Sequence, residues 1–153
     1  MEIIRGELPE AQVFPTVLGH ESAGRVVKIG EKVKAYKIGD MVVRASLPST
    51  DKYASSWGGF SEYGLVTDAK AMEADGKSYS PGLTQQVVPD GITAIQASLM
   101  ITLKETCSAV NRMNVKKEDH IMIVGDGPVG LCFLSNLICE GYTDVQMLSL
   151  IHI

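Results

Sequence analysis

The chain of 153 residues has room for one ordinary domain or for parts of two. Its hydrophobic content of 45% and charged content of 21% are typical of a soluble globular protein, and no apolar run reaches the ~18 residues that a membrane span needs. The net charge of −4 is small and the basic residues form no block, which argues against electrostatic binding of nucleic acid.

The first part of the chain, residues 13–89, is rich in valine and glycine and is interrupted by turn signals. Near its start, the stretch Gly19-His20-Glu21-Ser22-Ala23-Gly24 places a histidine and a glutamate side by side between glycines. Many short strands with tight turns are typical of a β-sandwich or a small barrel. Short strands are predicted at 26–29, 41–43 and 60–66, and polar loops at 47–57 and 69–81.

From Gly91 the hydrophobic period changes to that of a helix. Apolar residues recur at helical spacing from Ile92 to Met113, and a compact apolar strand follows at 121–124. Pro128 suits the first turn of a second helix, because the N–H that proline lacks would have no partner there. That helix is predicted to continue to Glu140, and a second strand to span 144–148. The order strand, helix, strand is the opening of a βαβ unit.

The turn between this strand and helix reads Gly125-Asp126-Gly127-Pro128-Val129-Gly130, which fits G-x-G-x-x-G. Because it follows an apolar strand and opens a helix, it has the context of a dinucleotide-binding turn. Gly125 would make the sharp turn, Gly127 would let the backbone approach a pyrophosphate, and Gly130 would allow close helix packing. The alternative is a purely structural turn. The predicted cofactor-binding residues are Gly125, Gly127, Pro128, Val129 and Gly130.

The choice of coenzyme, NAD or NADP, stays open at this point. A ribose-binding acid is expected ~20 residues beyond the turn, at the end of the second strand. That window falls near Ser149, and no carboxylate follows Asp144 in the sequence. The residue that usually distinguishes the two coenzymes is therefore not identified.

Several motifs occur in the order found in one enzyme family. The stretch around His20 continues to Val33 as G-H-E-x2-G-x5-G-x2-V, which closely resembles the zinc-type signature of the medium-chain alcohol dehydrogenases. The resemblance runs in order over most of residues 5–148. Further segments resemble the motifs that follow in that family: 39–43 (G-D-x-V), 58–63 (G-G-F-A-E-Y), 88–91 (P-D-G) and 115–119, the approach to the coenzyme domain.

The resemblance implies a fold of the α/β plus β class. Residues 1–91 would form a partial GroES-like β-barrel, the catalytic domain of such enzymes, and residues 92–148 a helical connector and the start of a Rossmann-type coenzyme domain. Residues 149–153 resemble translated sequencing-adapter read-through, so a non-native tail is expected there. Met1 is expected to be an internal methionine of a longer parent protein, with ~30–40 residues of the barrel before it.

The resemblance also implies a metal site. In such enzymes the histidine of G-H-E is a catalytic zinc ligand, which assigns His20 to the metal; the adjacent glutamate lies close to the metal and can join its coordination, which assigns Glu21. Zinc would stabilise the alkoxide formed from an alcohol while hydride passes to the nicotinamide. The alternative for His20 is a turn histidine hydrogen-bonded to the backbone.

The ligand set in this sequence is incomplete. A catalytic zinc needs three protein ligands, whereas the chain clearly supplies His20, and no cysteine precedes Cys107. The third ligand of the family comes from the helix that enters the coenzyme domain, where Glu105 and Cys107 lie, but neither is assigned to the metal. Residues 44–70 contain no cysteine, which excludes the four-cysteine structural zinc lobe of many relatives. One catalytic zinc and no structural zinc are therefore expected.

The sequence thus predicts part of a zinc-dependent oxidoreductase that transfers hydride between an alcohol or polyol and NAD or NADP. The parent is expected to be an enzyme and a homo-oligomer without nucleic-acid or membrane partners, whereas the truncated chain is expected to be inactive. The alternatives are a zinc-free quinone or enoyl reductase of the same fold and a non-catalytic fold fragment or binding module. Three cysteines without a C-x-x-C motif suit reduced thiols and a cytoplasmic location.

Overall fold

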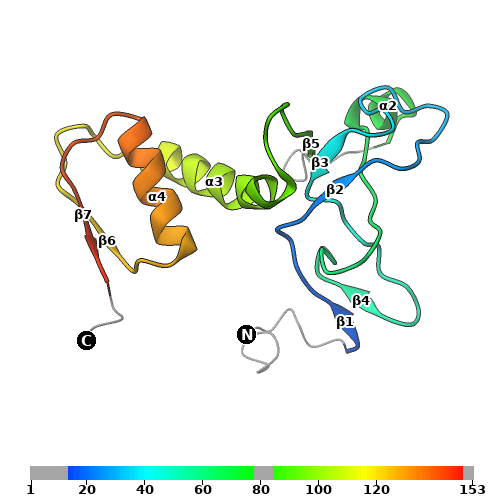
Figure 1. Ribbon diagram of the computed structural model, residues 1–153, viewed down its shortest axis with the longest axis horizontal. Helices are drawn as coiled ribbons and strands as arrows, with labels where there is room; N and C mark the ends of the chain where they lie inside the picture. The colour runs from blue at the N-terminus through cyan, green and yellow to red at the C-terminus, as the bar shows by residue number, and fades with distance from the viewer. Residues whose placement is uncertain (1–13, 78–84, 150–153) are drawn as a thin grey trace. The chain divides into compact units, whose positions relative to one another are not determined.

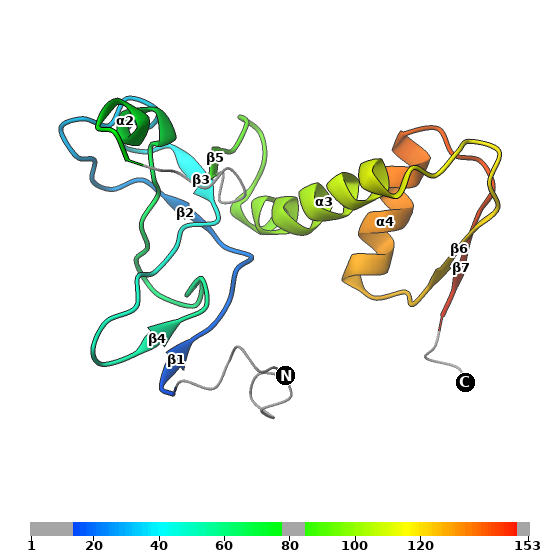
Figure 2. The same ribbon diagram turned by 180° about the vertical axis from the view of Figure 1, so that it is seen from behind.

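The computed structural model describes residues 14–77 and 85–149 of the chain. The chain divides into two compact units, Met1–Ser98 and Leu99–Ile153. Figure 1 labels the helices and strands of both units, and Figure 2 shows the same elements from behind. Met1, which is expected to be an internal methionine, and residues 150–153 of the expected non-native tail 149–153 lie outside the described residues.

The first unit contains short strands arranged in two open sheets. β1 (Thr16–Val17) pairs in parallel with β4 (Ala54–Ser55). In the second sheet, β3 (Met41–Val43) lies between β2 (Ala23–Arg25) and β5 (Gln86–Val87), and both pairings are antiparallel. Neither sheet closes into a barrel within the described residues. This arrangement agrees with the prediction of a partial barrel.

The middle strand β3 carries much of the core of the first unit. Val42 and Val43 are 2% and 5% exposed, and Val88, which follows β5, is similarly buried. The register pairs Ala23 with Val43, so the residues just before β2 lie beside those just after β3. This register brings the turn that contains the His-Glu pair close to the end of β3.

Two of the strands predicted in this unit differ from those observed. β2 occupies Ala23–Arg25 rather than 26–29. Its pairing with β3 ends at Arg25, which lies opposite Met41, the first residue of β3. No strand forms over 60–66, where Leu65 makes only an isolated bridge to Ser46. The alternation of polar and apolar residues there resembles a strand, but the two glycines before Phe60 favour a turn instead.

The helix α2 (Ala69–Ala74) forms within a segment that the sequence predicts to be a loop. Asp68 is its N-cap, and the carboxylate accepts a hydrogen bond from Ala71 N at 3.1 Å. The same carboxylate accepts hydrogen bonds from Lys34 N and Ala35 N, at 2.8 and 2.9 Å. The prediction was wrong because this short helix has no apolar period and its cap is held by a distant loop.

The long helix α3 (Ala94–Met113) leads into the second unit. It begins with a capping box, in which Gln96 N donates to Thr93 Oγ1 at 3.3 Å and Thr93 N donates to Gln96 Oε1 at 2.9 Å. Two of its apolar side chains, Ile101 and Val110, are almost fully buried. Among the described residues, no helix combines the length and apolar character required to cross a membrane.

The second unit continues with β6 (Ile121–Val124), α4 (Pro128–Cys139) and β7 (Val145–Leu148). β6 and β7 pair in parallel with Ile121 opposite Val145, and α4 contacts both strands (Figure 1). Asn136 on α4 donates hydrogen bonds to Leu103 O at 3.0 Å and Thr106 Oγ1 at 2.7 Å, which ties α4 to α3. The predicted opening of a βαβ unit is confirmed.

Candidate functional site

The glycine turn between β6 and α4 is built by contacts within the motif itself. Gly125 has a φ of +110°, a left-handed conformation that favours glycine. A Cβ atom at Gly130 would lie 2.0 Å from Gly125 O, so a side chain at position 130 would collide with the backbone of the turn. The first helical turn can therefore approach the end of β6 only because position 130 is glycine.

The middle of this turn is open to solvent. Gly127 is the N-cap of α4 and is exposed, and no atom lies within 4 Å of the place where its Cβ would be. Pro128 occupies the first turn and has no N–H, whereas Val129 and Gly130 each carry one. A helix N-terminus with such N–H groups attracts phosphate. The geometry therefore suits a pyrophosphate at the predicted residues.

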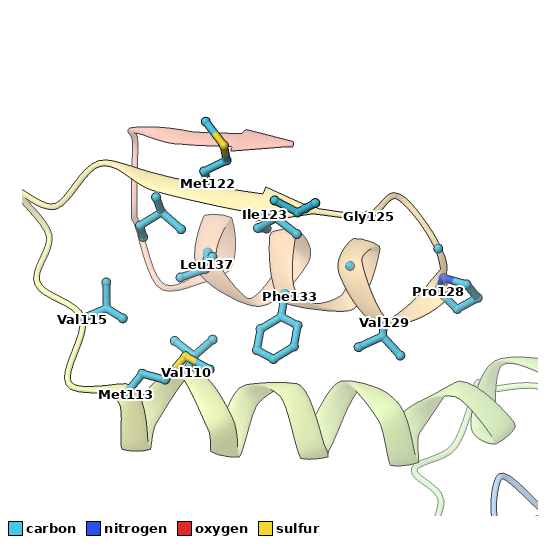
Figure 3. A pocket seen from close by; sticks show the side chains of 14 residues that line it. Val110, Met113, Val115, Met122, Ile123, Gly125, Pro128, Val129, Phe133 and Leu137 are labelled. Carbon is cyan, nitrogen blue, oxygen red and sulfur yellow. The ribbon is translucent and has the colours of Figure 1, made fainter. Parts of the chain in front are cut away.

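An apolar cavity of about 530 Å³ lies beside the glycine turn (Figure 3). The turn forms one end of this cavity, and the rest of the lining comes from β6, α3, α4 and Val115, which lies in the loop between α3 and β6. Figure 3 shows Phe133 pointing from α4 toward α3, with Val110 and Met113 opposite. No charged side chain lines the cavity, so it does not suit a phosphate, which the backbone of the turn would bind instead.

The turn that carries His20 and Glu21 connects β1 to β2, and a second chain segment holds it. Gly59 N donates to Gly19 O at 2.7 Å, and Phe60 N donates to Leu18 O at 3.0 Å. The backbone thus brings the G-H-E motif and the G-G-F motif together. Both His20 and Glu21 are exposed, so the turn presents an imidazole and a carboxylate at the surface of the first unit.

Two glycines permit this close approach. Gly19 has a φ of +95°, and a Cβ there would lie 2.8 Å from Cδ1 of the Phe60 ring. A Cβ at Gly59 would lie 3.0 Å from the carbonyl carbon and oxygen of Gly19. On the other side of the pair, Arg44 N donates to Ser22 O at 2.8 Å. The turn is therefore anchored at both ends by backbone hydrogen bonds from distant residues.

The described residues do not complete a zinc site. Among them, no group of three or more His, Cys, Asp or Glu side chains is placed to hold a metal ion. His20 and Glu21 are zinc donors by their chemistry, but a catalytic zinc needs three protein ligands. Within the second unit, Glu105 is exposed, and Cys107 Sγ lies 3.8 Å from Asn111 Nδ2. This donor set therefore does not fit a complete zinc centre.

Two features of the first unit were not predicted from the sequence. Asp68 is 5% exposed, and hydrogen bonds to its carboxylate, from Lys34 N first and then from Ala35 N, lower its pKa. Arg44 lies over the Trp57 ring, with Cζ 4.2 Å from the ring centre. An aspartate before the helix-forming stretch of α2 was a signal for the first feature, whereas no sequence pattern indicated the second.

Several known proteins are similar to this chain. The family described as "Alcohol dehydrogenase GroES-like domain" matches residues 1–76. The chain is 28% identical to (R,R)-butanediol dehydrogenase of Bacillus subtilis (strain 168), over 91% of the chain and 40% of that enzyme. The crystal structure of 2R,3R-butanediol dehydrogenase from Bacillus subtilis matches 92% of the chain and 41% of its own, with a TM-score of 0.64 and 26% identity. The chain belongs to the zinc-dependent medium-chain alcohol dehydrogenase family.

Membership of the family confirms the predicted fold class, a partial GroES-like domain followed by the start of a Rossmann-type domain. Sorbitol dehydrogenase of Bombyx mori is another similar protein, 30% identical over 79% of the chain and 36% of that enzyme. The chain spans about two fifths of the length of the curated relatives it matches. Zinc and NAD or NADP are the cofactors that this family implies. The predicted roles of His20, Glu21 and the residues of the glycine turn stay predictions.

Proposed function

We propose that the chain is part of an oxidoreductase that transfers hydride between an alcohol or polyol and NAD or NADP. The observation that carries this proposal is the β6–turn–α4 unit, in which only glycine fits at position 130. Similar proteins named for butanediol and sorbitol support the substrate class. We propose residues 1–91 and 92–148 as the limits of the catalytic and coenzyme parts, and residues 149–153 as a non-native tail.

In this proposal the residues of the glycine turn hold the pyrophosphate of the coenzyme. Gly125 turns the chain at the end of β6, and the open space at Gly127 admits the phosphates to the backbone. The N–H groups of Val129 and Gly130, with the positive end of the α4 dipole, bind the negative charge. The bound nicotinamide supplies the chemistry of accepting or donating hydride.

For the metal, we propose that His20 and Glu21 contribute to the catalytic zinc of the parent enzyme. Their exposed turn lies on the first unit, and both side chains are of types that bind zinc. The described residues offer no group of three donors, so the remaining ligands of this zinc are not assigned. Neither Glu105 nor Cys107 is assigned to the metal.

The proposed setting is that of a cytoplasmic enzyme that forms homo-oligomers at full length, without nucleic-acid or membrane partners. No disulfide joins the three cysteines, which suits a reducing compartment. We also propose that the 153-residue chain alone does not reduce a nicotinamide coenzyme with an alcohol. Zinc-dependent turnover by the purified chain, measured as NADH or NADPH absorbance, would contradict this part of the proposal.

Coenzyme binding is tested by titrating the 15N-labelled chain with NADH and separately with NADPH. We expect the amide signals of Gly127, Val129 and Gly130 to shift first, because these groups face the phosphates. The Gly130→Val variant is the control, since its side chain would occupy the turn. Signals that shift elsewhere while those of the turn stay unchanged would refute this assignment.

Metal binding is tested on the same chain by adding Zn²⁺ alone. We expect the imidazole signals of His20 to shift at lower Zn²⁺ concentration than those of His120, an exposed histidine that contacts Asp144 instead. The Glu21→Gln variant should weaken the response of His20, because it removes the neighbouring negative charge. Equal responses of the two histidines in the unmodified chain would show that His20 has no preference for the metal.

A further inference from the structure

The residues that follow β3 and precede the G-G-F motif have an unusual backbone. Arg44 has a φ of +62° and Trp57 a φ of +69°, and neither is glycine. Bulky side chains rarely adopt this left-handed region, and such conformations persist where the surrounding structure holds them. The two residues face each other across the first unit, with the Arg44 guanidinium 4.2 Å from the centre of the Trp57 ring. Both are half-buried.

Each member of this pair is joined to a different anchor of the His-Glu turn. Arg44 N donates to Ser22 O at 2.8 Å, directly after Glu21. Trp57 immediately precedes Gly58 and Gly59. At the other end of the His-Glu turn, Gly59 N donates to Gly19 O at 2.7 Å. Trp57 O also accepts a hydrogen bond from Leu47 N at 2.7 Å, which fixes the start of the G-G-F segment.

We propose that Arg44 and Trp57 are positioning residues, whose cation–π contact locks together the two segments that hold the His20–Glu21 turn. Together with the hydrogen bond from Leu47 N to Trp57 O, this contact would couple the hydrogen bonds on the two sides of the turn. The proposed consequence is a well-defined backbone beneath the imidazole and carboxylate. This inference rests on the proposed function of His20 and Glu21 as ligands, because the turn otherwise has nothing to position.

Hydrogen exchange of the amides that anchor the turn, measured on the full 153-residue chain, tests the proposal. In Trp57→Leu, we expect the amides of Gly59 and Phe60 to exchange at least about threefold faster, the factor that the loss of a cation–π contact implies. In Trp57→Phe, which keeps an aromatic face for the guanidinium, exchange should remain close to that of the unmodified chain. Rescue by phenylalanine distinguishes the ring contact from simple packing.

The Arg44→Gly variant separates the contact from the backbone conformation. Glycine adopts a φ of +62° without strain, so this variant removes the guanidinium and leaves the backbone of position 44 relaxed. If Arg44 served only as a turn residue, the Gly59 and Phe60 amides would exchange no faster. We expect instead an acceleration of about threefold, similar to that of Trp57→Leu.

A pair of reference amides and a control variant test for general destabilisation. Val26 N and Gly39 N form hydrogen bonds at another part of the same unit, at 2.9 and 2.8 Å, and their exchange should change less than that of Gly59 and Phe60. The Tyr142→Leu variant is the matched control, because it removes a second cation–π contact, to Lys117 in the other unit. It should leave the anchoring amides unchanged.

The proposal is overturned if Trp57→Leu and Arg44→Gly accelerate the Gly59 and Phe60 amides by less than about threefold. It is also overturned if the Val26 and Gly39 amides accelerate equally, or if phenylalanine behaves as leucine does. These outcomes do not depend on whether His20 binds zinc, which the Zn²⁺ titration tests separately. If the Zn²⁺ titration fails but the exchange pattern is as expected, the proposed role of His20 in metal binding is refuted. The contact between Arg44 and Trp57 would then stabilise the turn without a role in metal binding.

Discussion

Two glycine-containing turns carry the proposed chemistry of this chain, and they differ in what holds them. In the turn between β6 and α4, the close contact joins Gly130 to Gly125, residues of the same motif. In the turn between β1 and β2, Gly19 is held by Gly59 and Phe60, which come from a distant segment. The first turn is therefore a local structure, whereas the second depends on the surrounding unit.

This difference determines how each turn should respond to change. A local turn is disrupted mainly by substitutions within its own motif, because its contacts lie within a few residues of one another. A turn held by a distant segment is also sensitive to substitutions far along the chain, including those at Arg44 and Trp57. The following variants test this distinction, beginning with the largest expected effect.

The local turn is broken most severely by Gly130→Ala. The added Cβ would lie 2.0 Å from Gly125 O and 3.1 Å from Gly125 C, and these backbone atoms cannot move aside as the end of a flexible side chain could. We expect the second unit to lose roughly 3 kcal/mol or more of its free energy of unfolding. Urea unfolding followed through the amide signals of β6, α4 and β7 measures this loss.

The matched control is Gly127→Ala in the same turn. No atom lies within 4 Å of the added Cβ, and the φ of −72° is one that alanine adopts readily. We expect a change of less than about 1 kcal/mol. Equal losses in the two variants would contradict the claim that close packing at position 130 is what requires glycine.

The distant turn is tested by Gly19→Ala, with a smaller expected effect. The Cβ would lie 2.8 Å from the Phe60 ring, but this ring is 80% exposed and can move aside. We expect the first unit to lose about 2 kcal/mol of unfolding free energy, from the left-handed φ and the displaced ring together. Urea unfolding followed by fluorescence of the single tryptophan, Trp57, measures the loss.

Two further variants separate the causes of that loss. Gly39→Ala introduces the same kind of backbone strain, at a φ of +92°, with no atom within 4 Å, so about 1 kcal/mol is expected. Gly19→Ala combined with Phe60→Ala should return to a similar value, because the collision with the ring is gone. If the double variant remains as unstable as Gly19→Ala alone, Phe60 does not constrain the turn.

The contrast between the turns also explains which elements the sequence predicts well. The strand at 121–124 was predicted with its observed limits, and the helix that starts at Pro128 was also found. Their signals lie within the segment itself, as an apolar run, a glycine turn and a proline suited to the first helical turn. Such local patterns can be recognised in the sequence without knowledge of the tertiary contacts.

Elements that depend on distant partners were predicted poorly. The stretch 60–66 alternates like a strand, but Ser61 Oγ donates to Gly58 O and Tyr63 O, at 2.7 and 2.8 Å, within a turn. The cap of α2 is held by Lys34 and Ala35, which no local pattern links to Asp68. For the site, the G-H-E and G-G-F motifs were identified, but their contact with each other was not.

We expect the buried carboxylate of Asp68 to make the first unit sensitive to acid. Hydrogen bonds from Lys34 N, Ala35 N and Ala71 N stabilise the charged form and lower its pKa. A lowered pKa contributes stability above the unfolded value of ~3.9, and this stability is lost as pH falls through the folded pKa. We expect the urea concentration at the unfolding midpoint of the first unit, measured by Trp57 fluorescence, to decrease once the pH is lowered beyond about 4.

The Asp68→Asn variant shows how much of this acid sensitivity belongs to Asp68. Asparagine can still cap α2, but it carries no charge to satisfy the three N–H groups. We expect a loss of about 1 kcal/mol at pH 7 and a shallower decline of the midpoint between pH 5 and pH 3. A decline as steep as that of the unmodified chain would assign the acid sensitivity to other carboxylates.

The smallest effect is expected at the ion pair of Lys32 with Asp75, which also joins two distant segments of the first unit. Nζ lies 2.7 Å from Oδ1, but the lysine side chain is 72% exposed, so solvent screens the attraction. Lys32→Gln should therefore change the unfolding free energy by less than about 0.5 kcal/mol, as should Lys28→Gln, a nearby exposed control. A clearly larger loss for Lys32→Gln would mean that charge, as well as backbone hydrogen bonding, holds the distant contacts of this unit.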